Sequence, residues 1–266
     1  MKILFTGGGG VGSEGLYQLM KDTYDIHFAD ADKLSKPKCI PSKKWHKIPL
    51  ANESSFLSNL IKLCNKINVS VLVPTVDEEL LKISKARKEF NCNVLIPTPK
   101  FISTHLNKYK SYLILKKYNI GVAKTALLTQ KNKIKFPLII KPKSGRGSKN
   151  VSVINSDKQL QGYINFYDIK KNEYILQEKL NGTEYTVMVL ANEEKLISVV
   201  PVKIILKKGI TIRGITENNK KIINFCKKIH DSFQISGYYN VQLMINKKHQ
   251  IKIFEINPRV STTACL

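Results

Sequence analysis

The sequence predicts a chain in two parts: a parallel α/β domain over about residues 1–98, then an α+β region with antiparallel sheets over residues 99–266. Two observations carry this prediction. Strands alternate with helical segments in the first part, an order typical of a parallel sheet with helices on both faces. From residue 136 onward, long strands joined by short turns predominate, which is typical of antiparallel hairpins.

The elements of the first part follow one another at short spacing. Residues 2–6, KILFT, have the apolar character of a buried strand, and GGGGVGSEG leads from them into a helix around Leu16 to Met20. The next strand, DIHFAD, ends in an acidic residue. The remaining predicted elements are a helix near 53–67, a strand at 69–75, a helix near 77–90 and a strand at 94–98.

The second part begins with a helical segment at 107–118, and GVAKTALLT after it resembles an edge strand. No internal repeat or low-complexity linker interrupts the sequence. The predicted elements that follow are the strand PLIIKP, a helix at 157–168, the strand YILQEKL, two long strands joined at 192–195, a helix near 217–234 and a hairpin turning at 246–249.

Composition indicates an ordinary globular protein, with 42% apolar residues. No uninterrupted apolar run approaches the roughly 18 residues of a membrane span. The N-terminal segment before the first glycine is too short for the apolar region of a secretory signal. Five dispersed cysteines favour free thiols in a reducing compartment. We therefore expect a cytoplasmic protein.

The net charge of +24 raises the alternative of a nucleic-acid-binding protein, because basic surfaces neutralise phosphates. The 44 cationic residues include 4 arginines, which leaves 40 lysines dispersed along the chain. Arginine dominates specific recognition of bases and phosphates. A general lysine bias on solvated faces explains the charge better than a nucleic-acid partner does, and it makes the few arginines informative.

The glycine-rich segment after the first strand matches GxGxxG twice, and Asp30 and Asp32 follow about 20 residues later. A strand before it and a helix after it give the context of a Rossmann-like domain. Three interpretations remain open here. The glycines permit a tight turn, or their N–H groups bind an anion or substrate at the helix N-terminus, or the turn binds NAD(P).

A second glycine-rich segment follows the strand PLIIKP, which ends near Lys141. A strand-end lysine presents a fixed charge, and glycines after it allow backbone N–H groups to approach an anion. The GxxxxGK[ST] pattern of a P-loop is absent. By itself the segment fits a surface turn or a phosphate-binding loop, which would comprise Ser144, Gly145, Arg146, Gly147 and Ser148.

Polar residues interrupt the apolar strand IKIFEIN near the C-terminus. Glu255 and Asn257 stand at i and i+2, so they project from one face. Their oxygens suit Mg²⁺, which proteins commonly hold with one or two side chains. Gln242 on the partner strand offers another oxygen, and Arg259 just beyond offers a clamp for a negative intermediate. The alternative is an acidic residue at an exposed sheet edge.

Taken in order, the basic glycine-rich loop, QEKLNGTEYTV, NVQL and FEINPRVS resemble the ATP-grasp superfamily, and most of all ligases related to the carbamoyl-phosphate synthase large chain. The likeness covers essentially the whole chain. It implies a Rossmann-like domain at 1–98 ahead of a two-lobed ATP-grasp region, with a small lobe at about 110–180 and a large lobe at about 181–266. The pattern QL(x)₁₀FEINPR is specific, whereas the N-terminal glycines are not.

The resemblance also assigns roles to residues that it matches. Lys108 and Lys141 would contact ATP phosphates, with residues 144–148 as a lid. Glu184 would hold the ribose, beside an adenine site lined by Gln177, Glu178, Lys179 and Leu180. Mg²⁺, or Mn²⁺ in its place, would be held by Gln242, Glu255 and Asn257, while Arg259 and Arg213 would steady an acyl phosphate.

The chemistry implied by the family is the ATP-dependent joining of a small carboxylate and an amine, without a membrane or nucleic-acid partner. In two places the sequence departs from its relatives. Asn107 stands where many have Asp, and the chain stops at STTACL, seven residues after Arg259. The second departure suggests a truncated product, so the alternatives are a non-catalytic ATP-binding remnant and a fragment that needs a homodimer or a partner chain.

Overall fold

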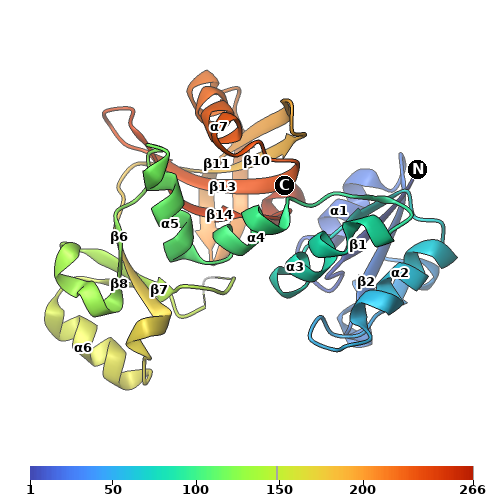
Figure 1. Cartoon of the computed structure of the whole chain (residues 1–266), viewed down its shortest axis with the longest axis horizontal. Helices are drawn as coiled ribbons and strands as arrows, with labels where there is room; N and C mark the ends of the chain where they lie inside the picture. Colours follow the sequence, from blue (N-terminus) through green and yellow to red (C-terminus); the bar gives the residue numbers. More distant parts are fainter. Residues whose placement is uncertain (148, 266) are drawn as a thin grey trace.

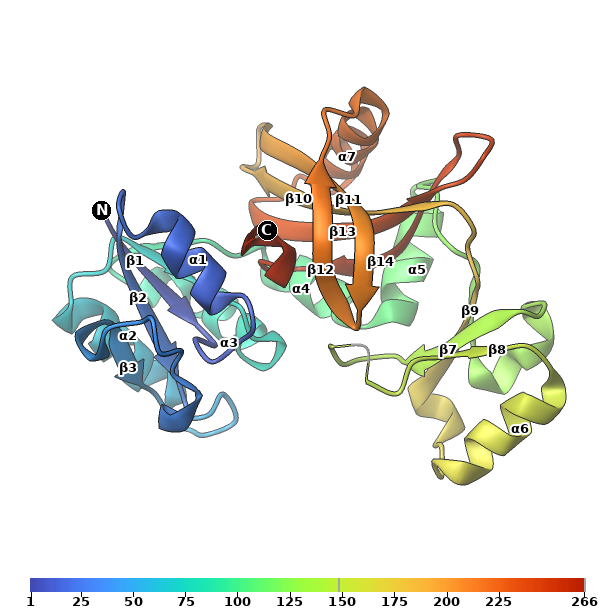
Figure 2. The same ribbon diagram turned by 180° about the vertical axis from the view of Figure 1, so that it is seen from behind.

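The computed structural model describes residues 1–147 and 149–265, and it arranges them around three β-sheets (Figure 1). In two opposite views, the central antiparallel sheet lies between the N-terminal domain and a smaller four-stranded lobe (Figures 1 and 2). No helix among the described residues is both long enough and apolar enough to cross a membrane. The predicted combination of α/β and α+β parts is confirmed.

The N-terminal sheet is parallel throughout and has the strand order β3-β2-β1-β4-β5. Side chains alternate between its faces, so that Leu4 packs under α2 and α3 while Phe5 packs under α1. The strands are β1 (Lys2–Thr6), β2 (Asp25–Asp30), β3 (Trp45–Lys47), β4 (Val71–Val73) and β5 (Asn93–Val94). The helices are α1 (Ser13–Met20), α2 (Phe56–Lys66) and α3 (Asp77–Lys85), with 3₁₀ turns η1 (Lys33–Ser35), η2 (Ser42–Lys44) and η3 (Arg87–Glu89).

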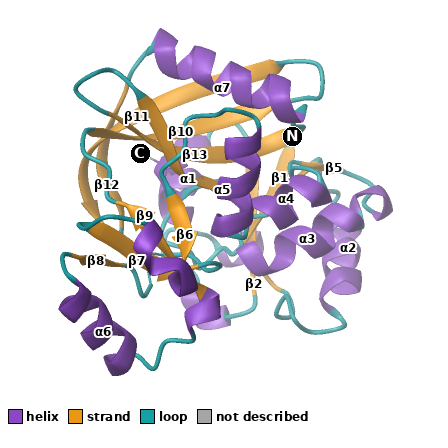
Figure 3. Ribbon diagram, turned by 60° about the vertical axis from the view of Figure 1, so that its left-hand side comes forward, coloured by secondary structure: helices purple, strands orange, loops and turns teal. Residues whose placement is uncertain are grey.

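The central sheet is antiparallel, in the order β12-β11-β10-β13-β14. Helices α4, α5 and α7 cover one face, where the buried core includes Val187, Val241 and Ile256 (Figure 3). The strands are β10 (Thr183–Ala191), β11 (Leu196–Lys208), β12 (Ile210–Thr216), β13 (Gly237–Ile245) and β14 (Ile251–Asn257). The helices are α4 (Pro99–His105), α5 (Lys108–Lys117) and α7 (Lys220–Phe233), with the 3₁₀ turn η6 (Thr262–Cys265) near the end of the chain.

The small lobe is a four-stranded sheet in the order β6-β9-β7-β8, with α6 packed against it. As predicted, GVAKTALLT contains an edge strand, β6. The short strands β3, β8 and β12, and helix α4, have no counterpart among the predicted elements. The strands are β6 (Thr125–Leu127), β7 (Leu138–Pro142), β8 (Ser152–Ile154) and β9 (Tyr174–Glu178). The helix α6 spans Asp157–Phe166, and the 3₁₀ turns are η4 (Leu128–Lys133) and η5 (Lys171–Glu173).

Candidate active site

One face of the β13–β14 hairpin carries amide and carboxylate side chains. Glu255 lies directly across from Gln242, and Asn257 lies across from Asn240. The residues between them, such as Val241 and Ile256, belong to the core on the opposite face. The four polar residues therefore share the face that helices α4, α5 and α7 leave uncovered.

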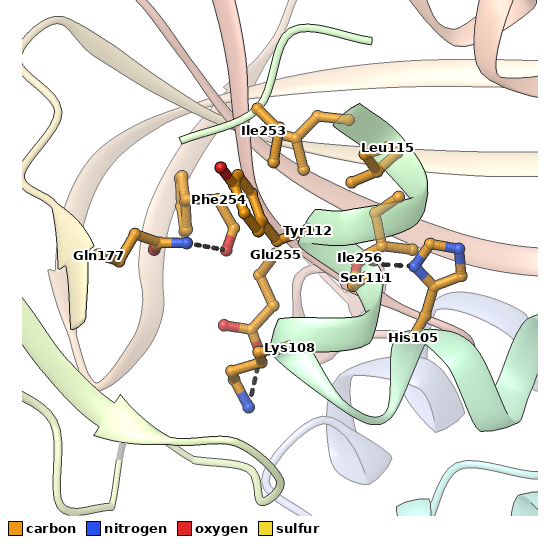
Figure 4. Close-up of a pocket in the computed structure, with 11 residues that line it drawn as sticks. His105, Lys108, Ser111, Tyr112, Leu115, Gln177, Ile253, Phe254, Glu255 and Ile256 are labelled. Atoms are coloured by element: carbon orange, nitrogen blue, oxygen red, sulfur yellow. Dashed lines mark hydrogen bonds and ion pairs between the residues drawn. The ribbon is translucent and has the colours of Figure 1, made fainter. Parts of the chain in front are cut away.

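A β-bulge in β14 shapes this face. The ladder pairs Glu255 with Gln242 but Ile253 with Leu243, which leaves Phe254 as the extra residue. The freed carbonyl of Phe254 accepts hydrogen bonds from Lys141 Nζ at 3.2 Å and from Gln177 Nε2 at 3.4 Å. The bulge thus ties the small lobe, which supplies Lys141 and Gln177, to the strand that carries Glu255. Figure 4 shows the bond from Gln177.

Two lysines from different elements converge on Glu255. Lys141, at the end of β7, places its Nζ 3.7 Å from one carboxylate oxygen of Glu255. Lys108, at the start of α5, places its Nζ 3.6 Å from the other (Figure 4). The Lys141 side chain is only 5% exposed, so this cation lies in a medium where its interactions with anions are strong.

Burial and mutual attraction determine the protonation of the pair. Burial lowers the pKa of Lys141 to about 8; attraction to Glu255 opposes this shift, whereas Lys108 and Lys207 add to it. Burial also raises the pKa of the Glu255 carboxyl, but attraction to the three lysines outweighs it, so the net pKa lies below its ordinary value. Glu255 is therefore ionised at neutral pH.

Lys207 is a third cation at this site, and the sequence analysis did not single it out. Its Nζ lies 2.5 Å from Glu184 Oε1, and it also lies 5.6 Å from the centre of the Phe254 ring. Glu184, the expected ribose ligand, is thus paired with a lysine. Three ammonium groups share two carboxylates here, a surplus of positive charge that suits a polyanionic ligand.

The start of α5 fixes the position of Lys108. Asn107 caps the helix, because its side-chain oxygen accepts the N–H groups of Tyr109 and Lys110, each at 3.1 Å. The Asp expected from relatives is therefore not needed for this cap. Lys108 also donates its backbone N–H to the Lys143 carbonyl at 2.7 Å, and its Nζ to the Gly145 carbonyl at 2.8 Å.

These bonds anchor the glycine-rich loop above the site. Ser144, Gly145, Arg146 and Gly147 are exposed, while Ser148 lies outside the described residues. Gly145 has a backbone φ of +119° and Gly147 has a φ of +70°, values that residues other than glycine rarely adopt. Glycine is thus required by the backbone path of this loop.

Of the described residues predicted to line adenine, Gln177 to Leu180, only Gln177 contacts the residues around Glu255. Gln177 is buried beside them, but Glu178 is engaged elsewhere, because its carboxylate accepts the Lys124 N–H at 2.8 Å and Lys252 Nζ at 2.6 Å. The Glu178 N–H donates to the Lys124 carbonyl at 2.9 Å. Lys179 is exposed and Leu180 is half-buried just beyond.

Among the described residues, the predicted arginines do not take part in the ion pairs of the lysine cluster. Arg259 donates from Nε to the Asp77 carboxylate at the start of α3, and from Nη1 to the Val260 carbonyl at 3.0 Å. Arg146 pairs with Glu78 of the same helix at 3.4 Å. Arg213 is exposed on β12. Two arginines thus connect the N-terminal domain with the glycine-rich loop and with the end of β14.

The N-terminal glycine turn is packed by protein atoms. The Asp30 carboxylate accepts the N–H groups of Gly9 at 2.8 Å and of Asp32 at 2.9 Å. A Cβ added at Gly15 would lie 2.7 Å from Cys265 Cβ, and one at Gly12 would lie 3.4 Å from atoms of η6. Close packing against η6 thus accounts for Gly12 and Gly15. Because the Asp30 carboxylate is already bonded to the turn, it is not available to a ribose, which disfavours NAD(P) binding there.

The donor set fits a metal ion that is shared with substrate phosphates. No group of three or more His, Cys, Asp or Glu that could hold an ion occurs among the described residues. The predicted ligands are instead one carboxylate and two amides. Beside them, the buried Asn240 Oδ1 has no hydrogen-bond partner among the described residues. Oxygen donors of this kind match Mg²⁺, with the remaining positions left to phosphate and water.

Sequence reasoning missed three residues of this neighbourhood. Lys207 could not be distinguished among 40 lysines, and Asn240 was passed over although it precedes Gln242 by two positions on the same strand. His105 lines the pocket beside Lys108, where burial lowers its pKa to about 3 and its Nδ1 lies 2.8 Å from Ser111 Oγ (Figure 4). A polar residue spaced by two from a predicted ligand was the available signal for Asn240.

Comparisons with known proteins agree on one family. The family model for the ATP-grasp domain matches residues 106–263. The large chain of carbamoyl phosphate synthase from Clostridium botulinum (strain Loch Maree / Type A3) is 24% identical over 202 residues, which cover 69% of this chain and 19% of that protein. The chain therefore spans about a fifth of the length of that relative.

Solved structures share the fold. An ADP complex of N5-carboxyaminoimidazole ribonucleotide synthetase superposes with a TM-score of 0.75 at 17% identity, covering 97% of this chain and 70% of that one. Biotin carboxylase from Campylobacter jejuni superposes with a TM-score of 0.72 at 12% identity, covering 99% and 66%. The mixed α/β architecture with its parallel and antiparallel sheets is common to them.

Proposed function

This chain belongs to the ATP-grasp family, and from that premise we propose that it is an ATP- and Mg²⁺-dependent ligase acting on a carboxylate and an amine or other nucleophile. The observation that carries the proposal is the convergence of Lys108 and Lys141 on Glu255, at 3.6 and 3.7 Å. Cations for phosphate and a carboxylate for metal thus meet from three separate elements. The domain limits proposed from the sequence, 1–98 and 99–266, go with this assignment.

Lys108 and Lys141 would bind the phosphates of ATP, and Lys207 would add a third charge. Phosphate oxygens would replace Glu255 as the partner of these ammonium groups, which frees the carboxylate for a metal ion. Because Lys141 is held against the Phe254 carbonyl, its charge is presented in a fixed position. Fixed charges stabilise a transferring phosphoryl group without reorganisation.

Glu255, Asn257 and Gln242 would hold Mg²⁺. When bound, the ion neutralises negative charge on the phosphates during transfer. Asn240, directly across from Asn257, presents an additional oxygen on the same face. Ionised Glu255 supplies the one negative charge of this donor set, so we expect the ion to bind together with ATP.

The proposed reaction has two steps. An oxygen of the carboxylate substrate attacks the γ-phosphorus, the bond from that phosphorus to the bridging oxygen breaks, and ADP leaves. The nucleophile then attacks the carbonyl carbon of the acyl phosphate, phosphate leaves, and an amine nucleophile loses a proton. Arg259 and Arg213 would steady the acyl phosphate, and Asp77 fixes the position of the Arg259 side chain.

The nucleoside end of ATP would lie toward Gln177, Glu178, Lys179 and Leu180, with Glu184 on the ribose. Two contacts qualify this assignment. Glu184 is paired with Lys207, so ribose binding has to share or displace that lysine. The Glu178 side chain bonds to Lys124 and Lys252, which leaves its backbone carbonyl and the following residues for adenine.

Titration calorimetry of ATP, with and without Mg²⁺, tests the proposal. We expect the wild type to bind ATP and Lys141→Ala to bind it about 10- to 100-fold more weakly, the usual effect of losing a hydrogen bond to a charged group. Lys149→Ala is the matched control, because Lys149 is an exposed lysine of the same loop, and its affinity should not change. Glu255→Ala should lose the dependence on Mg²⁺.

The reaction itself is checked by ADP release in a screen of carboxylates with amines. We expect ADP release to require one member of each class and to be lost in Glu255→Ala. Absence of ATP binding by the wild type, or equal effects of the two lysine variants, would overturn the assignment of the phosphate site. ADP release that does not depend on a carboxylate or an amine would overturn the assignment as a ligase, while the assignment of ATP binding would stand.

A further inference from the structure

The small lobe carries a largely apolar groove between the edge strand β8 and helix α6. It encloses about 450 Å³ and is lined by Val153, Gly162, Tyr163, Phe166 and Tyr167, among others. Three aromatic rings pack in a row here, with Tyr163 and Tyr167 at 4.7 Å and Phe166 and Tyr167 at 4.8 Å between ring centres. Phe166 is nevertheless 81% exposed.

Gly162 keeps the groove open. It lies inside α6, where glycine costs about 1 kcal/mol of helix stability relative to alanine. A Cβ added there would meet nothing within 4 Å, and the residue does not have a positive φ. Neither packing nor backbone conformation therefore requires glycine at this position. Gly162 lines the groove, and because it has no side chain it leaves room there for a ligand.

Strand β8, of three residues, is the edge of its sheet and carries none of the charges that commonly protect an edge. Among the described residues, no strand pairs with its outer side. Edge strands are commonly blunted by lysine or another charge, because their free N–H and C=O groups otherwise pair with another chain. Residues 150–156, NVSVINS, contain no charge although lysine is abundant elsewhere. Val151 and Val153 are each 40% exposed.

We propose that this groove binds an extended, acidic peptide segment of a partner protein, which pairs with β8 as an added strand and packs apolar side chains against α6. An edge strand beside a helix is the arrangement that other peptide-binding domains use for strand addition. Alternate residues of the segment would point into the groove, between Gly162 and Phe166, while the others face solvent.

Charge decides the kind of segment. Residues 149–171, which contain β8 and α6, have 4 Lys against 2 Asp, so this part of the chain carries +2. The whole chain carries +24, so two copies repel each other and a second copy is a poor occupant. Acidic residues on the solvent side of the peptide would instead face the surrounding lysines, such as Lys149 and Lys158. The proposal is independent of the ligase reaction.

An array of eight-residue peptides tests the proposal with the full chain. One half of the array alternates Glu or Asp with Val, Ile or Phe, and the other half carries Lys in place of the acids. We expect acidic members to bind, measured by fluorescence anisotropy, and lysine members not to. Gly162→Leu fills the groove and should weaken binding about tenfold or more. Leu34→Ser, at a residue 94% exposed in the N-terminal domain, is the matched control and should bind normally.

Amide hydrogen exchange distinguishes strand addition from other contacts. The bound peptide should protect the amides of residues 151–154, and Gly162→Leu should abolish that protection. Failure of every acidic peptide to bind, equal binding by the lysine peptides, or unchanged affinity in Gly162→Leu would each overturn the proposal. So would a dimer in sedimentation velocity that Gly162→Leu dissociates, because the occupant would then be a second copy.

Discussion

Lys141 is a buried cation whose charge depends on its neighbours. Burial lowers its pKa from 10.5 to about 8, and the nearby Lys108 and Lys207 keep it low despite the attraction of Glu255. An arriving phosphate would favour the charged form, because an opposite charge raises the pKa of an ammonium group. Lys141, which we place on an ATP phosphate, should therefore gain a proton when ATP binds in the range between pH 8 and 10.5.

We expect ATP binding to take up a proton above the folded-state pKa of about 8. In that range Lys141 is largely neutral in the free protein and charged in the complex. Calorimetry in buffers of different ionisation enthalpy measures the uptake, and Lys141→Ala should lose it while Lys149→Ala keeps it. An equal proton uptake in both variants would contradict the assignment.

The same shift has a defined effect on stability. The folded-state pKa lies below the ordinary value, so the unfolded chain binds more protons between pH 8 and 10.5. Burial of charged Lys141 therefore lowers the free energy of unfolding below pH 8. The free energy of unfolding rises again as the pH increases from 8 to 10.5. The arrangement favours ligand binding at the expense of the free protein.

At the scale of elements, the bulge in β14 and the start of α5 do most to shape the site. The bulge interrupts the ladder at Phe254. The Phe254 carbonyl therefore accepts hydrogen bonds from Lys141 and Gln177 and not from the neighbouring strand. Asn107 sets the first turn of α5 and thereby the origin of the Lys108 side chain. Two local features, each only a few residues long, thus direct side chains that meet across the lobes.

Two helical glycines should respond in opposite ways to alanine. Gly15→Ala in α1 brings a Cβ to 2.7 Å from Cys265 Cβ, so we expect a loss of about 1–3 kcal/mol from overpacking. Gly162→Ala in α6 meets nothing within 4 Å, so we expect a gain of about 1 kcal/mol from helix propensity. Urea unfolding of both variants measures the difference. A gain at Gly15 would mean that η6 does not pack on α1.

At the scale of the whole molecule, the N-terminal domain meets the rest of the chain at the start of α3 as well as where η6 packs on α1. Asp77 holds Arg259, and Glu78 holds Arg146 of the glycine-rich loop. The adjacent Glu79 is buried, and its carboxylate accepts the N–H groups of Thr75 and Val76 at 3.0 Å each. Burial raises the pKa of Glu79 to about 7, against the pull of these bonds. Three consecutive acids thus bind three different parts of the structure.

The two ion pairs should contribute unequally. The Asp77 and Arg259 side chains are 16% and 14% exposed, so Asp77→Ala leaves a largely buried charge unpaired and should cost about 2–4 kcal/mol. Glu78 and Arg146 are 59% and 47% exposed, so Glu78→Ala should cost at most about 1 kcal/mol. Both variants lose one charge from the same helix start. Thermal unfolding compares them, and equal losses would contradict the role given to Asp77.

The sequence predicted the fold through its strand order and the site through one hairpin. Glu255 and Asn257 at i and i+2, with Gln242 on the partner strand, were expected on one face, and their register agrees. Strands β3 and β8 were not predicted because three residues are too few to show a period, and β12 was not predicted because Gly209 precedes it and Gly214 interrupts it. Arg213 is exposed on β12, across from Leu206 and next to the pair of Lys207 with Thr211, and its role at the site stays a prediction.

The sequence by itself determined the kinds of groups at the site and their order along the chain: cations after strands, a flexible glycine loop, and oxygen donors on the last hairpin. Only the tertiary structure decided which of these meet. Lys141 and Glu255 are far apart in the chain, and their 3.7 Å separation depends on the bulge at Phe254 and on how the lobes pack. Local sequence patterns fix side-chain direction within an element, whereas contacts between elements depend on packing of the whole core.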